Sequence, residues 1–466
     1  MSAVIQHNTT QTQGREPSPL PAGDGAAAFA FDGDGGVSRD AFAAHVRALA
    51  ARLPDAAHAV NLCEDRYRFL VAFCAVAVRG QVNLLPPTRT RAAIDEVRAR
   101  HADSYCIGDG GACGCDAAIA APDAHFVHLP PQLASLEGAP LRVADDAVVA
   151  IGFTSGSTGT PTPHAKTLGS LRTSTAQNLA ALAGLWAPEA TAQVIATVPP
   201  QHMYGIELSV MLPLLGPVSV HRGRPFFPDD IARALHEAPG ARVLVTTPVH
   251  LRTLLASDVA LPPLAGIVTA TAPLPQALAA EAEARCGCEV RETFGSTETC
   301  IIASRRTAVD EAWTAYPGVR LQPRPDGTLV SAAHLAEPVL LADLVEPRGE
   351  RGFVLRGRHA DLLEIAGKRA SLADLGRRLL EVPGVRDGAV FQLDDERAGV
   401  RRIAAVYVSD TLDEAAMRDA LRRCMDPVFL PRPLRRVDAL PRNDTGKLPR
   451  AALLRLLRCG EDGAAR

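Results

Sequence analysis

A run of small hydroxyl residues and glycines stands near residue 155 and is suited to anion binding. It reads Thr154-Ser155-Gly156-Ser157-Thr158-Gly159-Thr160-Pro161 and follows the apolar stretch Ala147 to Ile151, which predicts a short buried strand. The backbone N–H groups and hydroxyls of such a loop can converge on anionic oxygens, as the binding of a polyphosphate requires. No Gly-Lys-Ser/Thr closes the run, so it is not a Walker A loop. A flexible surface turn is the plain alternative.

Two distant segments carry further residues able to do chemistry. Phe294-Gly295-Ser296-Thr297-Glu298-Thr299 follows an alternating run from Cys288 to Thr293, and the segment Pro441 to Arg450 contains the pair Gly446-Lys447. With the hydroxyl-rich loop, in this order and at these separations, the segments resemble the AMP-forming adenylating superfamily. That family comprises acyl- and aryl-CoA synthetases, adenylation domains of nonribosomal peptide synthetases, and luciferases. The resemblance extends from about Leu62 to Leu456.

The resemblance implies a reaction in which a carboxylate attacks the α-phosphorus of ATP and pyrophosphate leaves. Two anions must approach one another, so the protein has to hold both and offset the developing charge. The loop Thr154 to Gly159 would bind the β- and γ-phosphates. The family usually has a lysine after the proline, where Thr162 stands here, and Lys166 or His164 could supply that charge. The loop could also work without it, with Lys166 as an ordinary surface residue.

The segment around Glu298 matches the "YG-x-TE" element of the family, which implies a magnesium site. A carboxylate beside a triphosphate makes physical sense only with a cation between them, so Glu298 would hold Mg²⁺ that bridges phosphate oxygens. Thr297 would donate to the α-phosphate, and Phe294, which precedes Gly295, would stack on the adenine. The alternative makes Glu298 a carboxylate in the first turn of a helix, where it offsets the helix dipole.

Shorter matches imply the remainder of the nucleotide site. Thr271-Ala272-Pro273 resembles a strand end whose backbone flanks adenine, although any strand that ends in Ala-Pro looks alike. Asp343 would accept hydrogen bonds from both ribose hydroxyls, or simply cap a turn, and Arg358 would reach the ribose and phosphate. The hinge residue of the family aligns with Ala360, and the adjacent Asp361 could absorb the backbone change instead.

Lys447 and His202 complete the expected chemistry. In the family a lysine close to the C-terminus contacts the carboxylate and the α-phosphate during adenylation, and Gly446 would let its loop approach closely. A solvent-facing lysine on a glycine turn is the alternative. The segment around His202 resembles the "P-x-x-H-x-x-G" motif of CoA-type members, whose histidine lies near the acyl pocket, but the ring could instead cap the following helix. Val210 to Leu214 would line an apolar acyl or aryl pocket.

The chain of 466 residues alternates strand and helix patterns and predicts an α/β protein of two domains. We expect a flexible tail over 1–24, a large adenylate-forming domain with several sheets over 25–356, and a small mobile α+β domain over 357–466. The net charge of −3 argues against a nucleic-acid partner selected by bulk charge. No apolar run is long enough to predict a membrane span, and the polar start lacks a signal-peptide core, which favours a cytoplasmic location.

Ten cysteines are scattered through the chain, which indicates reduced thiols rather than a disulfide framework. Cys106, Cys113 and Cys115 cluster in a glycine-rich segment. A metal site with His101 as the fourth ligand is one interpretation, but the spacing lacks paired C-x-x-C units and favours a variable loop.

The expected function is therefore the ATP- and Mg²⁺-dependent ligation of a small carboxylic acid, acyl or aryl, to a thiol. The thiol would belong to CoA or to the phosphopantetheine arm of an acyl carrier protein, and the small domain would turn between the two steps. The short chain looks like the compact bacterial ligases of aryl-polyene and related pigment pathways. Two alternatives stay open: an ATP enzyme that forms ADP and phosphate, and a degenerate homologue that binds nucleotide or carrier protein without turnover. Thr162 and Ala360 are the departures that favour the degenerate homologue.

Overall fold

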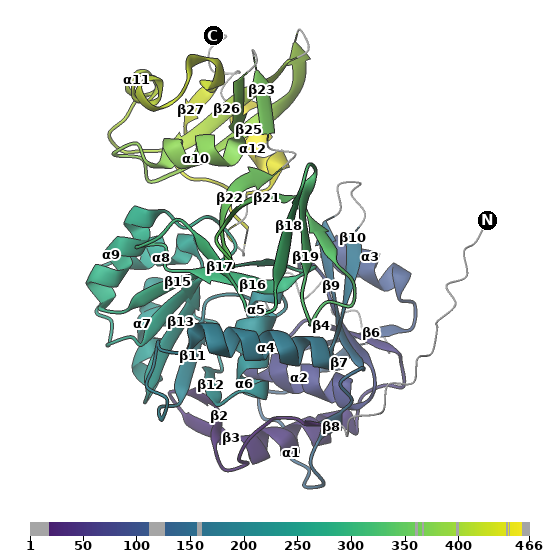
Figure 1. The fold of residues 1–466 in the computed structure, drawn as a ribbon. Helices are drawn as coiled ribbons and strands as arrows, with labels where there is room; N and C mark the ends of the chain where they lie inside the picture. Colours follow the sequence, from purple (N-terminus) through teal and green to yellow (C-terminus); the bar gives the residue numbers. More distant parts are fainter. Residues whose placement is uncertain are drawn as a thin grey trace, which may run out of the picture.

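The computed structural model describes residues 18–110, 126–155, 161–358, 362–365, 368–397, 400–443, 446 and 448–458. Figure 1 shows a large body with several sheets and a small body, drawn in yellow-green, that is built from the C-terminal elements. Strands and helices alternate along both bodies. The mixed α/β architecture, with a sheet-rich N-terminal part and a small C-terminal part, confirms the predicted fold class.

An eleven-stranded sheet is the largest of the sheets described in the large body. In sheet order its strands are β21 (Asp343–Arg348), β22 (Gly352–Arg358), β17 (Trp313–Ala315), β16 (Cys300–Arg305), β15 (Glu289–Ser296), β14 (Gly266–Thr269), β13 (Ala241–Thr246), β11 (Ala192–Ala196), β12 (Val218–His221), β2 (Ala28–Asp32) and β3 (Gly35–Ser38). The strands from β15 to β2 run parallel. The inner strands β11, β13 and β14 are buried and rich in apolar residues because both faces of a parallel sheet are covered. The carboxyl ends of these strands therefore meet along one edge.

A six-stranded sheet carries the segment on either side of the hydroxyl-rich loop. Its order is β10 (Pro161–Thr167), β9 (Val148–Ser155), β5 (Val82–Leu85), β4 (His58–Asn61), β6 (Ser104–Gly108) and β7 (Phe126–His128). β9 runs parallel to β5 and antiparallel to β10, with Thr162 opposite Thr154 and His164 opposite Gly152. The loop thus joins two neighbouring antiparallel strands.

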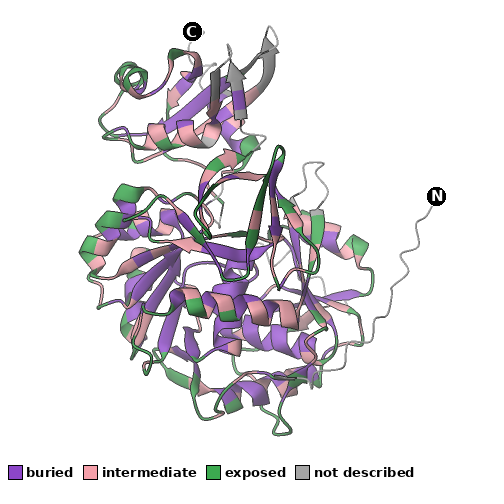
Figure 2. Ribbon diagram, viewed as in Figure 1, coloured by how far each residue is buried: buried purple, intermediate pink, exposed green. Residues whose placement is uncertain are grey.

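Helices fill the space between the two sheets and cover their outer faces. Those of the large body are α1 (Arg39–Ala50), α2 (Arg66–Val78), α3 (Arg91–Arg100), α4 (Leu168–Leu182), α5 (Met203–Gly205), α6 (Leu212–Leu215), α7 (Pro228–Glu237), α8 (Pro248–Leu255) and α9 (Gln276–Cys286). A short π-helix, η2 (Ile206–Met211), connects α5 to α6. α2 is apolar on nearly all sides and is buried along its length, as Figure 2 shows in purple.

Short sheets complete the large body. β18 (Arg320–Arg324), β19 (Gly327–Ser331) and β20 (Val339–Leu341) form an antiparallel sheet. β1 (Ser18–Pro19) pairs with β8 (Arg142–Val143), and Leu20 is buried. The described chain is thus already bonded to the large body inside the stretch expected to be a tail. Among the described residues, no helix has the length and apolarity to cross a membrane.

The small body has its own core. It comprises β23 (Leu362–Ile365), β24 (Lys368–Ser371), α10 (Leu372–Leu380), β25 (Asp387–Arg397), β26 (Val400–Val408), α11 (Glu414–Cys424), β27 (Leu434–Arg436) and α12 (Arg450–Arg458), with a 3₁₀ turn at Pro427–Phe429. Leu379, Tyr407 and Met417 are fully buried within it. One carboxylate links the two bodies, because Asp387 pairs with Arg442 at 2.6 Å and lies 4.0 Å from Arg252 on α8.

Candidate active site

Three segments that are far apart in the sequence meet at Gly152 on β9. A methyl group on this glycine would lie 2.9 Å from Thr297 Cγ2 and 3.6 Å from Met203 Cε. β9 leads into the hydroxyl-rich loop, Thr297 follows β15, and Met203 follows His202. The contact therefore brings together the strand that precedes the predicted phosphate loop, the predicted magnesium segment and the predicted acyl segment.

Glycine is required at two positions of this site, Gly295 near the end of β15 and Gly205 at the end of α5. A Cβ atom on Gly295 would lie 2.1 Å from the carbonyl oxygen of Cys300, and one on Gly205 would lie 2.0 Å from that of Pro199. No side chain fits at such distances, so the backbone at both positions depends on the missing Cβ. Before Gly295, the half-buried ring of Phe294 packs 5.5 Å from Trp313, between ring centroids. The aromatic packing fixes the ring on one side and leaves part of it accessible.

Glu298 lies in the turn between β15 and β16 and not on a helix, so its interpretation as a helix-dipole carboxylate is wrong. Its carboxylate lies 3.5 Å from His164 Nε2, and that nitrogen lies 3.0 Å from Thr154 Oγ1. Partial burial opposes ionisation, but the hydrogen bond from Ser296 and the nearby His164 and Lys166 outweigh it and lower the pKa of Glu298. The site therefore presents a carboxylate next to a hydroxyl and an imidazole.

His164 and Lys166 point from the same face of β10 toward Glu298 but engage different parts of it. The imidazole faces the carboxylate, whereas the ammonium group donates to the backbone carbonyl of Glu298 at 2.8 Å. Burial, with a smaller effect of Lys166, lowers the pKa of His164 despite the opposing charge of Glu298. Lys166 is only 5% exposed, so its interpretation as a surface lysine is wrong.

The predicted adenine strand end lies against the C-terminal loop. Thr271 follows β14 and has a φ of 79°, a left-handed conformation that is rare for a β-branched residue. A Cβ atom on Gly446, whose φ is 77°, would lie 3.9 Å from Thr271 Oγ1 and 3.7 Å from Thr247 Oγ1. Ala272 and Pro273 follow in the same loop, which Leu274 anchors by donating to Glu292. Gly446 thus lies against the large body beside the strand ends.

Asp343 and Arg358 lie opposite one another on β21 and β22. Arg358 Nε donates to Asp343 Oδ1 at 3.3 Å, and the arginine is well exposed. The backbone oxygen of Asp343 accepts from Thr328 at 2.6 Å. Both side chains keep polar atoms exposed to solvent. The pair lies at the end of β22, where the chain passes from the large body to the small body.

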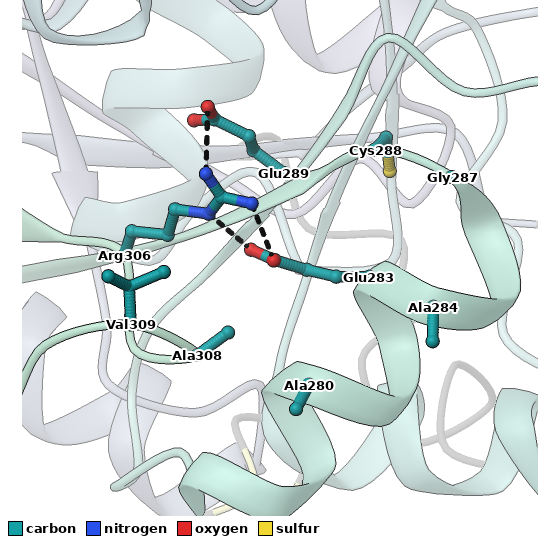
Figure 3. A pocket seen from close by; sticks show the side chains of 9 residues that line it. All are labelled: Ala280, Glu283, Ala284, Gly287, Cys288, Glu289, Arg306, Ala308 and Val309. Atoms are coloured by element: carbon teal, nitrogen blue, oxygen red, sulfur yellow. Dashed lines mark hydrogen bonds and ion pairs between the residues drawn. The ribbon is translucent and has the colours of Figure 1, made fainter.

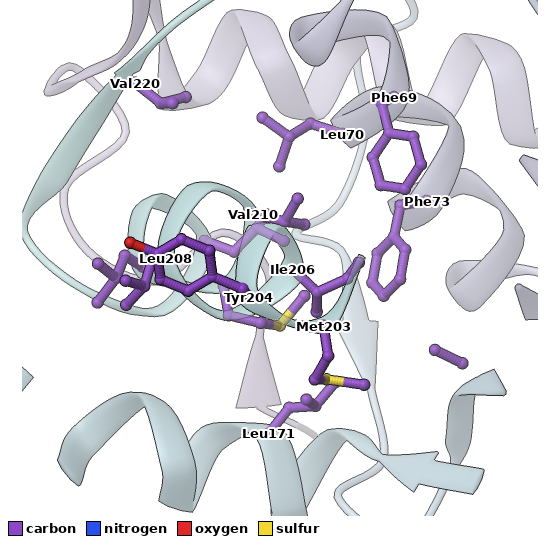
Figure 4. Packing of buried hydrophobic residues seen from close by; sticks show 14 of the residues in the cluster. Phe69, Leu70, Phe73, Leu171, Met203, Tyr204, Ile206, Leu208, Val210 and Val220 are labelled. Carbon is purple, nitrogen blue, oxygen red and sulfur yellow. The ribbon is translucent and has the colours of Figure 1, made fainter. Parts of the chain in front are cut away.

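His202 occupies the N-cap position of α5, but its side chain makes no capping hydrogen bond. Its interpretation as a helix cap is therefore wrong. The segment Val210 to Leu214, expected to line an acyl pocket, is buried in the core. Figure 4 shows Val210 and Ile206 packed among Phe69, Leu70 and Phe73 of α2.

Several predicted residues lie outside the described part of the chain. They are Gly156, Ser157, Thr158 and Gly159 of the loop, Lys447, and both hinge candidates, Ala360 and Asp361. Cys113 and Cys115 lie outside it as well. Within the described ranges, no group of three or more histidine, cysteine or acidic residues could hold a metal ion.

Sequence reasoning missed Glu207 and His334, which lie behind the turn of Glu298. Glu207 is fully buried on η2 and accepts from the backbone N–H of Ile301 at 3.0 Å. His334 Nε2 lies 2.7 Å from the carbonyl oxygen of Thr299. An acidic residue within the apolar run from Met203 to Leu215 was the available signal, since a buried charge requires partners.

A surface cavity of about 520 Å³ lies at the far end of β15 from Phe294. Figure 3 shows Arg306 in this cavity between Glu283 and Glu289. The arginine donates to both oxygens of Glu283 at 2.9 and 2.8 Å and to Glu289 at 3.3 Å. Its charge is matched within the protein, and the cavity is separate from the site at the carboxyl end of the strand.

Comparison with known protein families gives two matches. The family model of the AMP-binding enzymes matches residues 27–325, and that of the AMP-binding enzyme C-terminal domain matches residues 377–447. The chain therefore belongs to the family of AMP-binding enzymes.

Individual relatives cover most of the chain. It is 30% identical to the probable 2-succinylbenzoate–CoA ligase of Mycobacterium tuberculosis, over 72% of this chain and 91% of the relative. It is 29% identical to the 4-coumarate–CoA ligase of Rhodobacter capsulatus, over 66% and 76%. Among solved structures, ATP-bound MatB from Rhodopseudomonas palustris superposes with a TM-score of 0.79 at 21% identity and covers 93% of this chain and 96% of MatB.

Proposed function

We propose that this protein activates a carboxylic acid with ATP and then transfers the acyl group to a thiol. In the first step a carboxylate oxygen bonds to the α-phosphorus, the bond from that phosphorus to the bridging oxygen breaks, and pyrophosphate leaves. In the second step a thiolate attacks the acyl carbon, and AMP leaves. The observation that carries the proposal is the contact of Gly152, Thr297 and Met203 at one point.

ATP would bind along the carboxyl ends of the parallel strands. Thr154 and the loop after it would hold the β- and γ-phosphates, Thr297 the α-phosphate, and Phe294 the adenine. Asp343 and Arg358 would hold the ribose. Proteins of this α/β type bind ligands at the carboxyl ends of their strands, which supports this assignment.

Magnesium fits the residues present. Glu298 is partly exposed, its lowered pKa keeps it ionised at neutral pH, and Mg²⁺ prefers one or two carboxylates together with phosphate oxygens. A bound Mg²⁺ would offset the charge of the triphosphate. Thr154 and His164 lie beside this carboxylate, so they would contact the same phosphate groups.

The acid would enter near His202 and Met203. Lys447 would contact its carboxylate, and the position of Gly446 beside Thr271 supports this, since Gly446 immediately precedes Lys447. The relatives act on 2-succinylbenzoate and 4-coumarate, which are aromatic acids, so an aryl acid is the first substrate class to test. Both relatives are CoA ligases. CoA and a carrier protein present the same terminal thiol, and the small body would turn at Ala360 or Asp361 to admit it.

The decisive experiment is the exchange of labelled pyrophosphate into ATP with a panel of aryl, unsaturated and aliphatic acids. We expect exchange that depends on one class of acid and on Mg²⁺. Acid-independent formation of ADP would instead favour an ATP enzyme of another type. Binding of ATP without any exchange across the panel would favour a degenerate homologue.

His164 provides a test of how the loop works without the usual lysine. We expect His164→Ala to raise KM for ATP about tenfold, because an exposed or partly buried contact to phosphate contributes roughly 1.4 kcal/mol. Thr162 is exposed and lies two residues before His164 on β10. The double variant His164→Ala/Thr162→Lys should recover most of the affinity in steady-state kinetics. No effect of the single variant, or no recovery in the double, would contradict the assignment.

A further inference from the structure

The turn that carries Glu298 is held in an unfavourable conformation. It runs from Ser296 to Ile301, and Cys300 within it has a φ of 59°. A non-glycine residue in the left-handed region costs roughly 1–2 kcal/mol, so surrounding contacts must stabilise it. Internal bonds between Ser296 and Thr299 close the turn but do not fix it to the rest of the protein.

Three side chains from distant segments of the chain form hydrogen bonds with the backbone of this turn on its buried side. Lys166 of β10 donates to the oxygen of Glu298 at 2.8 Å, and His334, after β19, lies 2.7 Å from the oxygen of Thr299. Both oxygens of Glu207 on η2 accept from the N–H of Ile301 at 3.0 Å. The backbone groups of Glu298, Thr299 and Ile301 are thereby bonded to side chains of the six-stranded sheet, of the segment after β19 and of η2.

Glu207 is arranged as a pure acceptor. It is 1% exposed, and it also accepts from the Ser174 hydroxyl at 2.6 Å and from the Asn178 amide at 3.2 Å, both on α4. Burial raises its pKa, while these donors and the charge of Lys166 favour the ionised form. The residue stands on a π-helix, and such short segments occur frequently at functional sites.

Lysine is rare in this chain, and Lys166 is one of the few. Only three of its 49 basic residues are lysines, and two of the three, Lys166 and Lys447, belong to the proposed site. The buried ammonium group donates to the carbonyl oxygen of Glu298 at 2.8 Å. A compact ammonium fits this space, whereas a planar guanidinium needs more room and more partners.

We propose that Lys166 and Glu207 are positioning residues that hold the turn from behind and so aim the carboxylate of Glu298 at the metal site. This inference rests on the proposed function, since it takes Glu298 as the residue that holds Mg²⁺. It also separates two roles on β10: His164 faces the phosphates, and Lys166 acts through Glu298. Residues that orient a metal ligand typically change metal affinity or activity 10- to 100-fold when they are lost.

The test is a Mg²⁺ titration of pyrophosphate exchange with Lys166→Met, Lys166→Arg and Glu207→Gln. Each should raise the half-saturating Mg²⁺ concentration at least about tenfold. Thioester formation from supplied acyl-adenylate should stay within about twofold of wild type, because that step does not need the Glu298 carboxylate. An unchanged Mg²⁺ requirement, or equal losses in both half-reactions, would overturn the inference. If the wild-type protein shows no acid-dependent exchange, the proposed function itself fails, which is a different result.

A milder pair of variants distinguishes a loss of positioning from a general loss of folding. Ser174→Ala removes a hydroxyl that donates to Glu207, and Thr175→Val removes an equally buried hydroxyl that donates only within α4, to Leu171. Ser174→Ala should raise the half-saturating Mg²⁺ about threefold, whereas Thr175→Val should leave it unchanged. Equal behaviour of the two variants would also overturn the inference.

Discussion

Replacing Lys447 with alanine should lower the rate of adenylate formation about 1,000-fold. The ammonium group is expected to offset charge as the carboxylate meets the α-phosphate, and the loss of one such electrostatic contact costs 10²- to 10³-fold in known enzymes. Gly446, one residue before it, already lies beside Thr271 and Thr247, so the loop has the reach that the role requires. Pyrophosphate exchange measures this step directly.

The second half-reaction provides the internal control for that variant. Thioester formation from supplied acyl-adenylate should survive in Lys447→Ala, because the phosphate bond has already been broken. Arg455→Ala, an exposed position on the neighbouring helix α12, should change neither step. A loss of equal size in both half-reactions would show that Lys447 supports the fold or the acyl site in general.

The substitution Glu298→Gln should lower pyrophosphate exchange about 100-fold and should not be rescued by excess Mg²⁺. The amide keeps the size and most hydrogen bonds of the side chain but lacks the charge that a divalent cation needs. The expected loss corresponds to about 2.7 kcal/mol of transition-state stabilisation. Initial rates over a range of Mg²⁺ and Mn²⁺ concentrations would measure it.

A matched control lies at the start of β15, the strand that leads to the turn of Glu298. Glu289 begins β15 and pairs with Arg291 at the surface. Glu289→Gln removes the same charge at the start of the strand that leads to the turn of Glu298, and we expect activity within about twofold of wild type. Comparable losses in the two glutamine variants would mean that the net charge of the region matters rather than the position of Glu298.

The sequence was most informative where chemistry depends on a contiguous motif. The segment of Glu298 keeps its glycine for a local reason, as the 2.1 Å approach at Gly295 illustrates. Such reasons can be inferred from a few adjacent residues. The predicted α/β class followed in the same way from alternating strand and helix patterns. The individual roles of Lys447, Thr297 and the ribose-binding pair stay predictions.

Features that depend on packing between distant elements were not predictable in the same way. An apolar run such as Val210 to Leu214 has the same pattern whether it lines a pocket or fills the core, and here it fills the core. The burial of Lys166 and the partners of Glu207 arise only when β10, η2 and α4 come together. A charged residue inside an apolar run indicates that partners must exist, but it does not identify them.

The carboxylate of Asp387 has a consequence for movement between the two bodies. Its 2.6 Å partner, Arg442, belongs to the same small body, whereas Arg252 of the large body is 4.0 Å away and already partly open to water. If the bodies separate, Asp387 keeps its nearer arginine, and Arg252 is hydrated rather than stranded in an apolar environment. The docked arrangement is therefore expected to come apart at a low electrostatic cost, as a small body that turned between the two proposed half-reactions would require.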